Sequence, residues 1–447
     1  MVRLRNVVLV PAILALLLAI SACGESEQQQ QSKTLTFWVP QESDSLEEDE
    51  AKFNKIAEDF EKQEGVTVEV KAISWDDLYQ DILTAITSGQ GPDVLNIGNT
   101  WAASLQATGA FVPFDEETMA KIGGEDKFVP AAMSSTGAPG QPPGSVPLYL
   151  LPDPVLFYNK AMFKEAGIQH PPKTWDGFIE VGKEFTKDTD GDGETDQWGV
   201  VTQAGDLYGN LHKAFVLSEQ YGGQWFDKND NPTFVQPENV DGIKLYVDLM
   251  AAYKILPPRM ASASAGTESE SEFVNGNAAM MIQPSTSTST LESRGMKTDE
   301  YGLAPIPVLD PLPAGGEPAV GYVSGTNTVV FKNASNQELA LDFVKYLTST
   351  EKQVELSQAY GSLFPAVSEA LEKPAFQGGQ MDVFTEILRN SAPLPQVPQE
   401  GEFETFVGKG VTNLIQQAAT AGSVTESDIK AELEAAQQKI KAGGGGG

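Results

Sequence analysis

The sequence predicts an α/β protein built from two lobes. The chain has 447 residues, which is more than one hydrophobic core usually supports. Its folded part opens with strand and helix patterns in alternation, and this alternation indicates a parallel sheet with helices on both faces. Further along, Pro152 and Pro154 interrupt a strand-rich stretch, as expected where the chain crosses from one lobe to the other.

The first elements follow from the spacing of the apolar residues. Strand patterns cover residues 34–39, 66–73 and 92–98, and amphipathic helix patterns cover 48–65 and 75–89. Gly65 ends the first helix. Ligands of such sheets bind beyond the carboxyl ends of the strands. This rule places Trp38 with the loop that follows it, and the GNTW segment at 98–101, near a possible site.

Later segments continue the same pattern. A strand followed by a helix is predicted within residues 148–168, helices are predicted at 174–185, 239–253 and 336–349, and a strand is predicted at 326–331. Thr174 is the expected cap of its helix. The polar segment 284–293 is predicted to be a loop or the start of a helix.

The N-terminus predicts export. Arg3 and Arg5 precede an apolar run at 7–20 and a short stretch of small residues, which is typical of a secretory signal. The run is shorter than the roughly 20 residues that span a bilayer. Cys23, the only cysteine, lies just after the small residues, and the segment resembles the lipobox of bacterial lipoproteins. We therefore expect a signal peptide at 1–22 and a lipid anchor on Cys23. A flexible tether is expected at 23–33 and a disordered glycine-rich tail at 442–447.

The composition excludes several functions. The formal net charge is -32, so the surface repels nucleic acid and no nucleic-acid partner is expected. One cysteine permits no internal disulfide. Two histidines leave little room for a Ser-His-Asp arrangement or a histidine metal site.

The segment DTDGDGETDQWG at 188–199 resembles half of an EF-hand calcium loop. That loop takes ligands from positions 1, 3, 5, 7, 9 and 12 and has glycine at position 6. The matching residues are Asp188, Asp190, Asp192, Gly193 at position 6, Glu194 through its carbonyl, and Asp196. Position 12 is Gly199 instead of glutamate, so the last ligand has to come from elsewhere. Hard oxygen ligands suit Ca²⁺, and we expect a structural calcium ion here. The competing interpretation is a solvated acidic turn.

Motifs along the mature chain, taken together, resemble one family. They are the lipobox, TLTFWV, GPDVLNIGNTW, TGAFVPFD, VLFYNKAMFKEAGI, PPKTWDGF, the acidic loop, YGGQWFD, EFVNGNAAMMI and YGSLFPAV. Their order is similar to that of the family 1 extracellular solute-binding proteins of bacterial ABC importers, the group that includes maltose-binding protein. The resemblance implies the two-lobed periplasmic-binding-protein (Venus flytrap) fold, in which each lobe has a mixed sheet and a hinge joins the lobes. Lobe 1 would comprise 34–151 and 323–375, and lobe 2 would comprise 152–322 and 376–441.

The same resemblance implies a function without covalent chemistry. The lobes would close on a sugar or oligosaccharide and present it to a membrane permease, and the protein would be a lipid-anchored extracytoplasmic monomer, not an enzyme. Sugar binding needs aromatic rings together with fixed hydrogen-bonding groups. Carried over by position, the expected ligand contacts are Trp38, Glu42, Asn99, Thr100, Trp101, Asp153, Tyr208, Asn210, His212, Gln283, Pro284, Ser285, Tyr322 and Phe403. Gln283, Pro284 and Ser285 stand where the family often has GPW, so the usual tryptophan is absent.

Other interpretations remain open at this point. The same fold could bind a non-sugar solute, although an anionic one would want an arginine cluster and Arg259, Arg294 and Arg389 are isolated. A secreted carbohydrate-active enzyme with a calcium ion is a second alternative, because 62 acidic residues do not exclude a catalytic carboxylate pair. A surface adhesin is a third alternative, and it predicts neither a small-molecule pocket nor closure.

Overall fold

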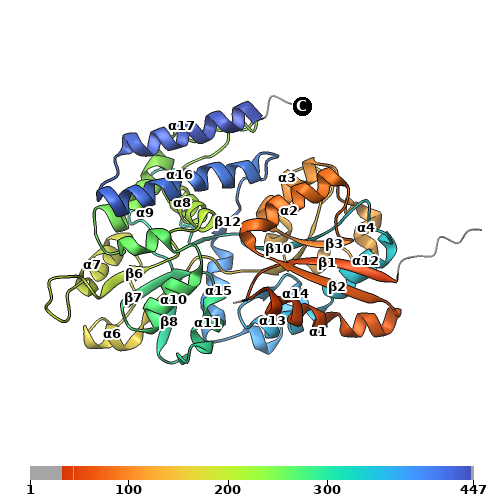
Figure 1. Cartoon of the computed structure of the whole chain (residues 1–447), viewed down its shortest axis with the longest axis horizontal. Helices are drawn as coiled ribbons and strands as arrows, with labels where there is room; N and C mark the ends of the chain where they lie inside the picture. Colours follow the sequence, from red (N-terminus) through yellow and green to blue (C-terminus); the bar gives the residue numbers. More distant parts are fainter. Residues whose placement is uncertain (1–32, 44, 444–447) are drawn as a thin grey trace, which may run out of the picture.

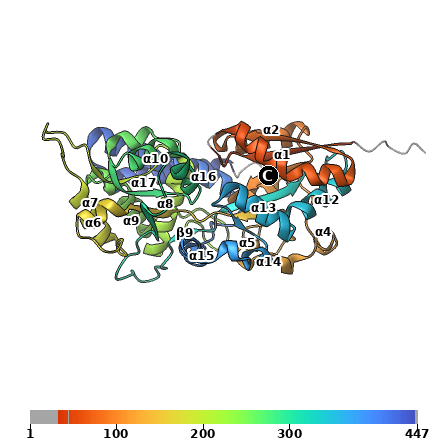
Figure 2. The same cartoon turned by 90° about the horizontal axis from the view of Figure 1, so that it is seen from below.

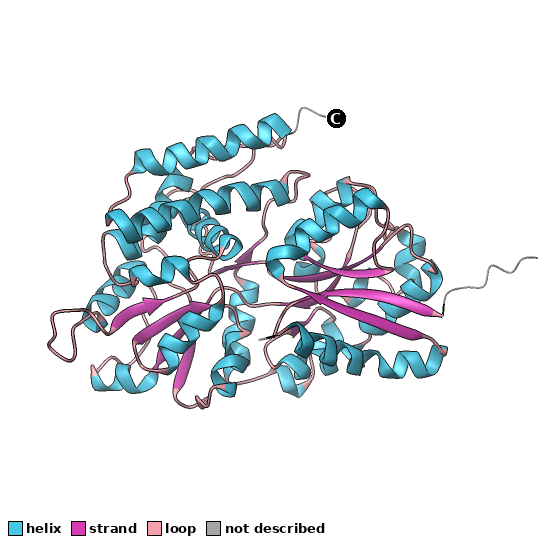
Figure 3. Cartoon of the chain, viewed as in Figure 1, coloured by secondary structure: helices cyan, strands magenta, loops and turns pink. Residues whose placement is uncertain are grey.

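The computed structural model describes residues 33–43 and 45–443 and consists of two lobes side by side (Figure 1). Each lobe has a β-sheet with helices packed around it (Figure 3). The predicted signal peptide, Cys23, most of the tether and residues 444–447 lie outside the described residues. No helix in the described ranges is both long and apolar enough to cross a bilayer.

The first lobe contains a six-stranded sheet in the order β11-β4-β10-β3-β1-β2. Its strands are β1 (Thr34–Pro40), β2 (Thr67–Ile73), β3 (Val94–Gly98), β4 (Val146–Leu150), β10 (Gly325–Val330) and β11 (Phe364–Pro365). β1 pairs in parallel with β2 and β3, as the alternating pattern predicts. β10 runs antiparallel to both β3 and β4. The sheet is therefore mixed, as the family resemblance implies, because a strand returning from far along the chain is inserted beside β3.

Helices cover both faces of this sheet (Figure 1). They are α1 (Leu46–Glu64), α2 (Trp75–Ser88), α3 (Ala102–Ala107), α4 (Glu116–Lys121), α5 (Pro130–Met133), α12 (Gln337–Leu347), α13 (Thr350–Tyr360) and α14 (Ser368–Leu371), with the 3-10 turns η1 (Asn99–Trp101), η2 (Glu125–Lys127) and η4 (Pro374–Phe376). Ser45 and Ser74 cap α1 and α2 through their side chains. Gly65 ends α1 with φ 67°, a left-handed conformation that favours glycine.

The second lobe contains a four-stranded mixed sheet in the order β6-β7-β5-β8. Its strands are β5 (Val155–Asn159), β6 (Trp198–Val201), β7 (Ala278–Gln283) and β8 (Tyr301–Pro305). Its helices are α6 (Lys160–Glu165), α7 (Trp175–Phe185), α8 (Leu207–Tyr221), α9 (Pro237–Ala251), α10 (Gly266–Val274), α11 (Ser287–Ser293), α15 (Gln380–Arg389), α16 (Glu400–Ala421) and α17 (Glu426–Gly443), with the 3-10 turn η3 (Pro258–Ser262). The Thr174 hydroxyl caps α7 by accepting from the Gly177 amide at 3.3 Å, as predicted.

The chain crosses between the sheets more than once. Residues 151–154 connect β4 of the first sheet to β5 of the second, at the predicted pair of prolines. Near the middle of the molecule, β9 (Gly321–Tyr322) pairs in parallel with β12 (Ser391–Ala392), and α15 lies beside them (Figure 2). The polar segment 284–293 contains a helix, α11, from Ser287. At the C-terminus α17 continues to Gly443, two residues into the stretch expected to be a disordered tail.

The long helix α16 belongs to the second lobe and reaches toward the first. It packs on α8, α9 and α17, and its N-terminal end contacts η1 and α3 (Figure 1). A side chain in place of Gly401 would overlap the Tyr79 hydroxyl of α2. The start of α16 is thus held against the first lobe at close range.

Candidate ligand-binding cleft

A cavity of about 400 Å³ lies between the lobes. From the first lobe it is lined by the loops that follow β1, β2 and β3, at residues 41–43, 74–76 and 98–101. From the second lobe it is lined by residues within 203–213, 264–270 and 283–290. The cavity therefore lies at the carboxyl ends of the parallel strands, where sheets of this kind bind their ligands.

Trp101 forms part of the first-lobe wall and is 2% exposed. Its ring packs against Trp75, Tyr79 and Tyr208, with centroid distances of 5.6, 5.0 and 5.9 Å. Its indole N–H donates a hydrogen bond to Glu404 Oε2 of α16. Trp75 and Tyr208 also line the cavity and are only half-buried. The wall thus presents an aromatic cluster that includes residues of both lobes.

Glu404 connects that cluster to the second lobe. Its carboxylate is 1% exposed and lies 2.8 Å from His212 Nε2. The His212 ring stacks on Tyr322 with a centroid distance of 4.1 Å. The Tyr322 hydroxyl donates to Asp153 at 3.0 Å and accepts from Ser324 at 3.1 Å. A chain of polar contacts therefore runs from the second lobe into the segments that cross between the lobes.

Lys213 is the basic counterpart of two of these acids. Burial lowers the pKa of Lys213, while the charges of Asp153 and Asp206 raise it. Burial raises the pKa of both aspartates, and Lys213 opposes that effect. Asp206 also caps α8 by accepting from the Gly209 amide at 2.7 Å. The Lys213 ammonium donates to the Gly209 carbonyl at 3.2 Å, and its charge acts on both aspartates without a close ion pair.

Glu42 occupies the loop after β1. It accepts a hydrogen bond from the Tyr149 hydroxyl at 2.9 Å. Burial raises the pKa of Glu42 to about 8, Tyr149 lowers it in part, and nearby Asp49 raises it further. Asp49 fixes the loop, because it accepts from the amides of Glu42 and Ser43 at 3.0 Å and from the Tyr360 hydroxyl at 2.7 Å.

Most of the sequence-predicted contacts meet at this cavity. Its lining includes Glu42, Asn99, Thr100, Trp101, Asp153, Tyr208, His212, Gln283, Pro284 and Tyr322. Asn99 also has a positioning role, since its amide donates to Ser135 at 2.9 Å and to the Val323 carbonyl at 2.7 Å. The Gln283 side chain is buried and donates to Ser269.

Four predicted contacts do not line the cavity: Trp38, Asn210, Ser285 and Phe403. The Trp38 ring lies under Lys71 at 4.7 Å. Asn210 is fully buried and binds Tyr246, Thr412 and the Ala204 carbonyl. The Ser285 hydroxyl donates to the Ser362 carbonyl at 3.0 Å. Phe403 packs within the lobe 2 core against Trp225, Phe226 and Phe234. Packing or internal hydrogen bonding explains each of these positions.

Several lining residues were missed from the sequence, including Trp75, Tyr149, Gln203, Asp206, Lys213 and Glu404. Trp75 and Asp76 follow β2 directly, so the strand-end rule applied to the loops after β1 and β3 would have found them. Glu404 is 303 residues from Trp101, and no local pattern marks it.

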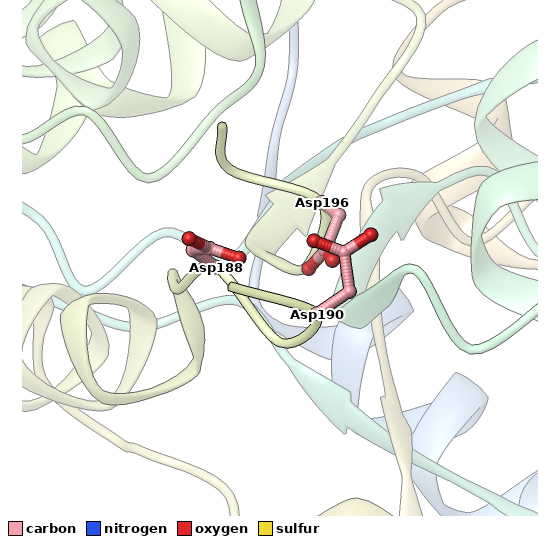
Figure 4. A group of neighbouring side chains, drawn as sticks. All are labelled: Asp188, Asp190 and Asp196. Atoms are coloured by element: carbon pink, nitrogen blue, oxygen red, sulfur yellow. The ribbon is translucent and has the colours of Figure 1, made fainter. Parts of the chain in front are cut away.

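The acidic loop lies far from the cleft, between α7 and β6. Antiparallel pairing of Lys187 with Gln197 closes it. Carboxylate oxygens of Asp188, Asp190 and Asp196 lie within 4.8 Å of one another (Figure 4). Asp192 and Glu194 are not part of that group. The amides of Gly191 and Gly193 donate to Asp188 at 2.6 and 2.8 Å, and these bonds lower the pKa of Asp188.

The structure explains why position 12 of this loop is glycine. Gly199 lies in β6 against α7, and a Cβ there would come within 2.3 Å of the Gly182 carbonyl oxygen. No side chain fits, so the bidentate glutamate of an EF-hand cannot occupy this position. Three converging carboxylates still fit an oxygen-liganded cation in the near half of the loop.

Comparison with known proteins places the chain in a family. Residues 43–354 match the family described as bacterial extracellular solute-binding protein. The chain is 24% identical over 380 residues to a maltotriose-binding protein of Pyrococcus abyssi, covering 81% of this chain and 73% of that one. It is 24% identical over 447 residues to a galactooligosaccharide-binding protein of Bacillus subtilis, covering 96% of each.

Among solved structures, an ABC transporter solute-binding protein from Thermotoga lettingae, bound with α-D-tagatose, superimposes with a TM-score of 0.76. The two chains are 23% identical, and the match covers 92% of this chain and 100% of the other. This likeness confirms the two-lobed periplasmic-binding-protein fold. The chain belongs to the family of bacterial extracellular solute-binding proteins.

Proposed function

We propose that the protein binds a sugar or oligosaccharide in the interlobe cleft and delivers it to the permease of an ABC importer. The observation that carries this proposal is the composition of the cleft wall. The aromatic residues Trp75, Trp101 and Tyr208 line the cleft together with the polar residues Glu42, Asp153 and Gln203. Sugars are recognised by this combination of apolar faces and fixed polar groups. The sugars bound by the relatives named above are consistent with it.

Binding would work by closure of the lobes. A ligand that contacts both walls binds the closed arrangement better than the open one and so shifts the population toward it. The contact between Trp101 of the first lobe and Glu404 of the second would then be a feature of the closed state. The proposed role is transport alone, with no catalytic step.

A thermal-shift screen of the purified protein against mono- and oligosaccharides tests this function. A ligand that binds only the folded state stabilises it by RT ln(1 + [L]/Kd), about 2.7 kcal/mol at a hundredfold excess over Kd. We expect a rise in melting temperature with one sugar class. A flat response to the whole panel, with a rise for a non-sugar solute, would contradict the proposal.

We also propose that the acidic loop holds one structural Ca²⁺ through Asp188, Asp190 and Asp196. Without a cation, three adjacent carboxylates repel one another. A bound ion would remove that repulsion and hold the loop between α7 and β6 in one conformation. Depletion of calcium with a chelator should lower the melting temperature, and readdition should restore it.

We propose, finally, that a lipid on Cys23 anchors the protein. Lipidation of Cys23 would anchor the protein, as a monomer, to the outer face of the cell membrane. Expression of the Cys23→Ala variant in a bacterial host should release the protein from the membrane fraction. Equal membrane retention of the variant and the wild type would contradict the anchor.

A further inference from the structure

The charged residues around the cleft are strongly unbalanced in sign. Six carboxylic residues line it, namely Glu42, Asp76, Asp153, Asp206, Glu270 and Glu404. Lys213 is the only lysine or arginine among the described lining residues. His212 lines the cavity as well, and it carries a charge only when protonated.

Ion pairs within the protein compensate only part of this charge. Glu270 lies 3.8 Å from the Arg294 guanidinium. The Lys213 ammonium donates to the Gly209 carbonyl at 3.2 Å and, among the described residues, has no carboxylate within 4.0 Å. In the part of the chain that the structure describes, no lysine or arginine lies within 4.0 Å of Asp76 or Glu404. Negative charge therefore exceeds positive charge on both walls of the cleft.

We propose that the preferred ligand is a sugar that carries a protonated amine. This inference rests on the proposed sugar-binding function and narrows its substrate class. It follows from the position of the carboxylates: Asp76 belongs to the first lobe, and Asp206 and Glu404 belong to the second. An ammonium group held between the lobes would face acids from both sides.

A neutral sugar would leave the imbalance in place. Its hydroxyls donate hydrogen bonds to carboxylates but bring no charge, and closure removes the water that screens the acids from one another. A cationic ligand supplies the missing charge at the moment of closure. The rings of Trp75 and Tyr208 add a second attraction, because aromatic faces attract cations.

Matched sugar pairs test the inference. The neutral sugar that gives the largest thermal shift is compared with its amino-deoxy analogues, in which one hydroxyl at a time is replaced by an amine. If no neutral sugar responds, glucose and its 2-, 3- and 6-amino analogues are used. Calorimetry at pH 7 in low and high salt gives the Kd of each. We expect at least one amine to bind tenfold or more tightly than its neutral counterpart, and salt to reduce that ratio.

Two variants on one helix show whether the preference for amines comes from acids in the cleft or from the negative charge of the whole protein. Asp76 lines the cleft at the start of α2, whereas Asp81 lies on the same helix outside the lining. Asp76→Asn should reduce the amine preference several-fold, and Asp81→Asn should leave it unchanged. An equal loss in both variants would contradict a role for the cleft acids.

A failure of the amine preference can be told apart from a failure of sugar binding. Tight binding of neutral sugars, with amines bound equally or more weakly, would overturn this inference and leave the proposed function standing. Absence of binding by every neutral and amino sugar would overturn the proposed function, and this inference with it.

Discussion

The indole N–H of Trp101 donates to the carboxylate of Glu404, a residue 303 positions further along the chain. Trp101 follows β3 of the first lobe, and Glu404 lies in the first turns of α16 in the second. Both side chains are almost fully buried, so water does not compete for this bond. It is a direct polar link between the lobes at the cleft wall.

Replacing Trp101 with phenylalanine should loosen the two lobes. The variant keeps an aromatic ring but removes the donor, which leaves a buried carboxylate oxygen of Glu404 without that partner. The cost of such a loss is about 1–3 kcal/mol. Small-angle X-ray scattering of the protein with a saturating sugar should show an increased radius of gyration, and thermal denaturation should show a lower melting temperature.

Trp175→Phe is the matched control for that variant. The Trp175 indole N–H donates to Gln220 at 3.0 Å, wholly within the second lobe. Its loss should lower the melting temperature without changing the radius of gyration. Equal radii for the Trp101 variant and the wild type would show that the bond does not hold the lobes together.

Trp75→Ala should weaken sugar binding with little effect on the fold. Trp75 lines the cavity and is half-buried at the start of α2. Loss of its ring should lower sugar affinity by about tenfold or more, given about 0.5–1.5 kcal/mol for aromatic contact in addition to the apolar area buried. Trp101→Ala is less informative, because that ring is buried against three others and its truncation should cost about 3–5 kcal/mol of stability. Calorimetry of the folded Trp75→Ala variant measures its Kd for the sugar. An unchanged Kd would show that this ring does not contact the ligand.

Glu42 should make stability depend on pH. Its folded-state pKa is about 8, compared with a reference value of 4.5, so the folded protein binds this proton more tightly than the unfolded chain. The linked contribution is fully present below about pH 4.5 and is lost as pH rises through about 8. It amounts to about 1.4 kcal/mol for each unit by which the two pKa values differ.

The Glu42→Gln variant isolates this contribution. It should flatten the fall in unfolding free energy between about pH 5 and pH 8, as measured by urea denaturation. Glu61→Gln serves as the control, because Glu61 accepts a hydrogen bond from the Val68 amide at 2.7 Å in the same lobe and does not line the cleft. Identical pH profiles for wild type and Glu42→Gln would rule out the raised pKa.

Asp190→Ala should abolish the stabilisation by calcium. It removes one of three converging carboxylates, and the remaining two bind the ion more weakly. Asp227→Ala is the control, because Asp227 accepts from Asn229 and Asn231 in a separate exposed acidic turn. Melting temperatures with calcium and with chelator should differ for wild type and Asp227→Ala, but not for Asp190→Ala. A calcium response retained in Asp190→Ala would contradict the proposed site.

Local patterns predicted the elements well because each is set by its own residues. The strand and helix alternation from β1 to β3, the cap at Thr174 and the helix end at Gly65 all follow from short-range spacing and capping. The rule that ligands bind beyond the carboxyl ends of the strands then correctly predicted that Trp101 lies at the cleft. The position of β10 beside β3 was not predictable in this way, since it depends on pairing across more than 200 residues.

Adjacent residues of α16 show why the site was harder to predict than the fold. Phe403 was predicted as a contact, yet it faces the lobe 2 core, while Glu404 faces the cleft. Successive residues of a helix point about 100° apart. An error of one position therefore selects a residue of the core instead of one that lines the cleft. The local sequence does not indicate which face of α16 contacts the first lobe.

Hydrogen exchange with and without a saturating sugar tests capture between the lobes most directly. We predict slower exchange at residues 74–76 and 98–101 of the first lobe and at 203–213 of the second lobe together, because one ligand contacts both walls. Protection confined to one lobe, or located away from these segments, would contradict binding in the interlobe cleft.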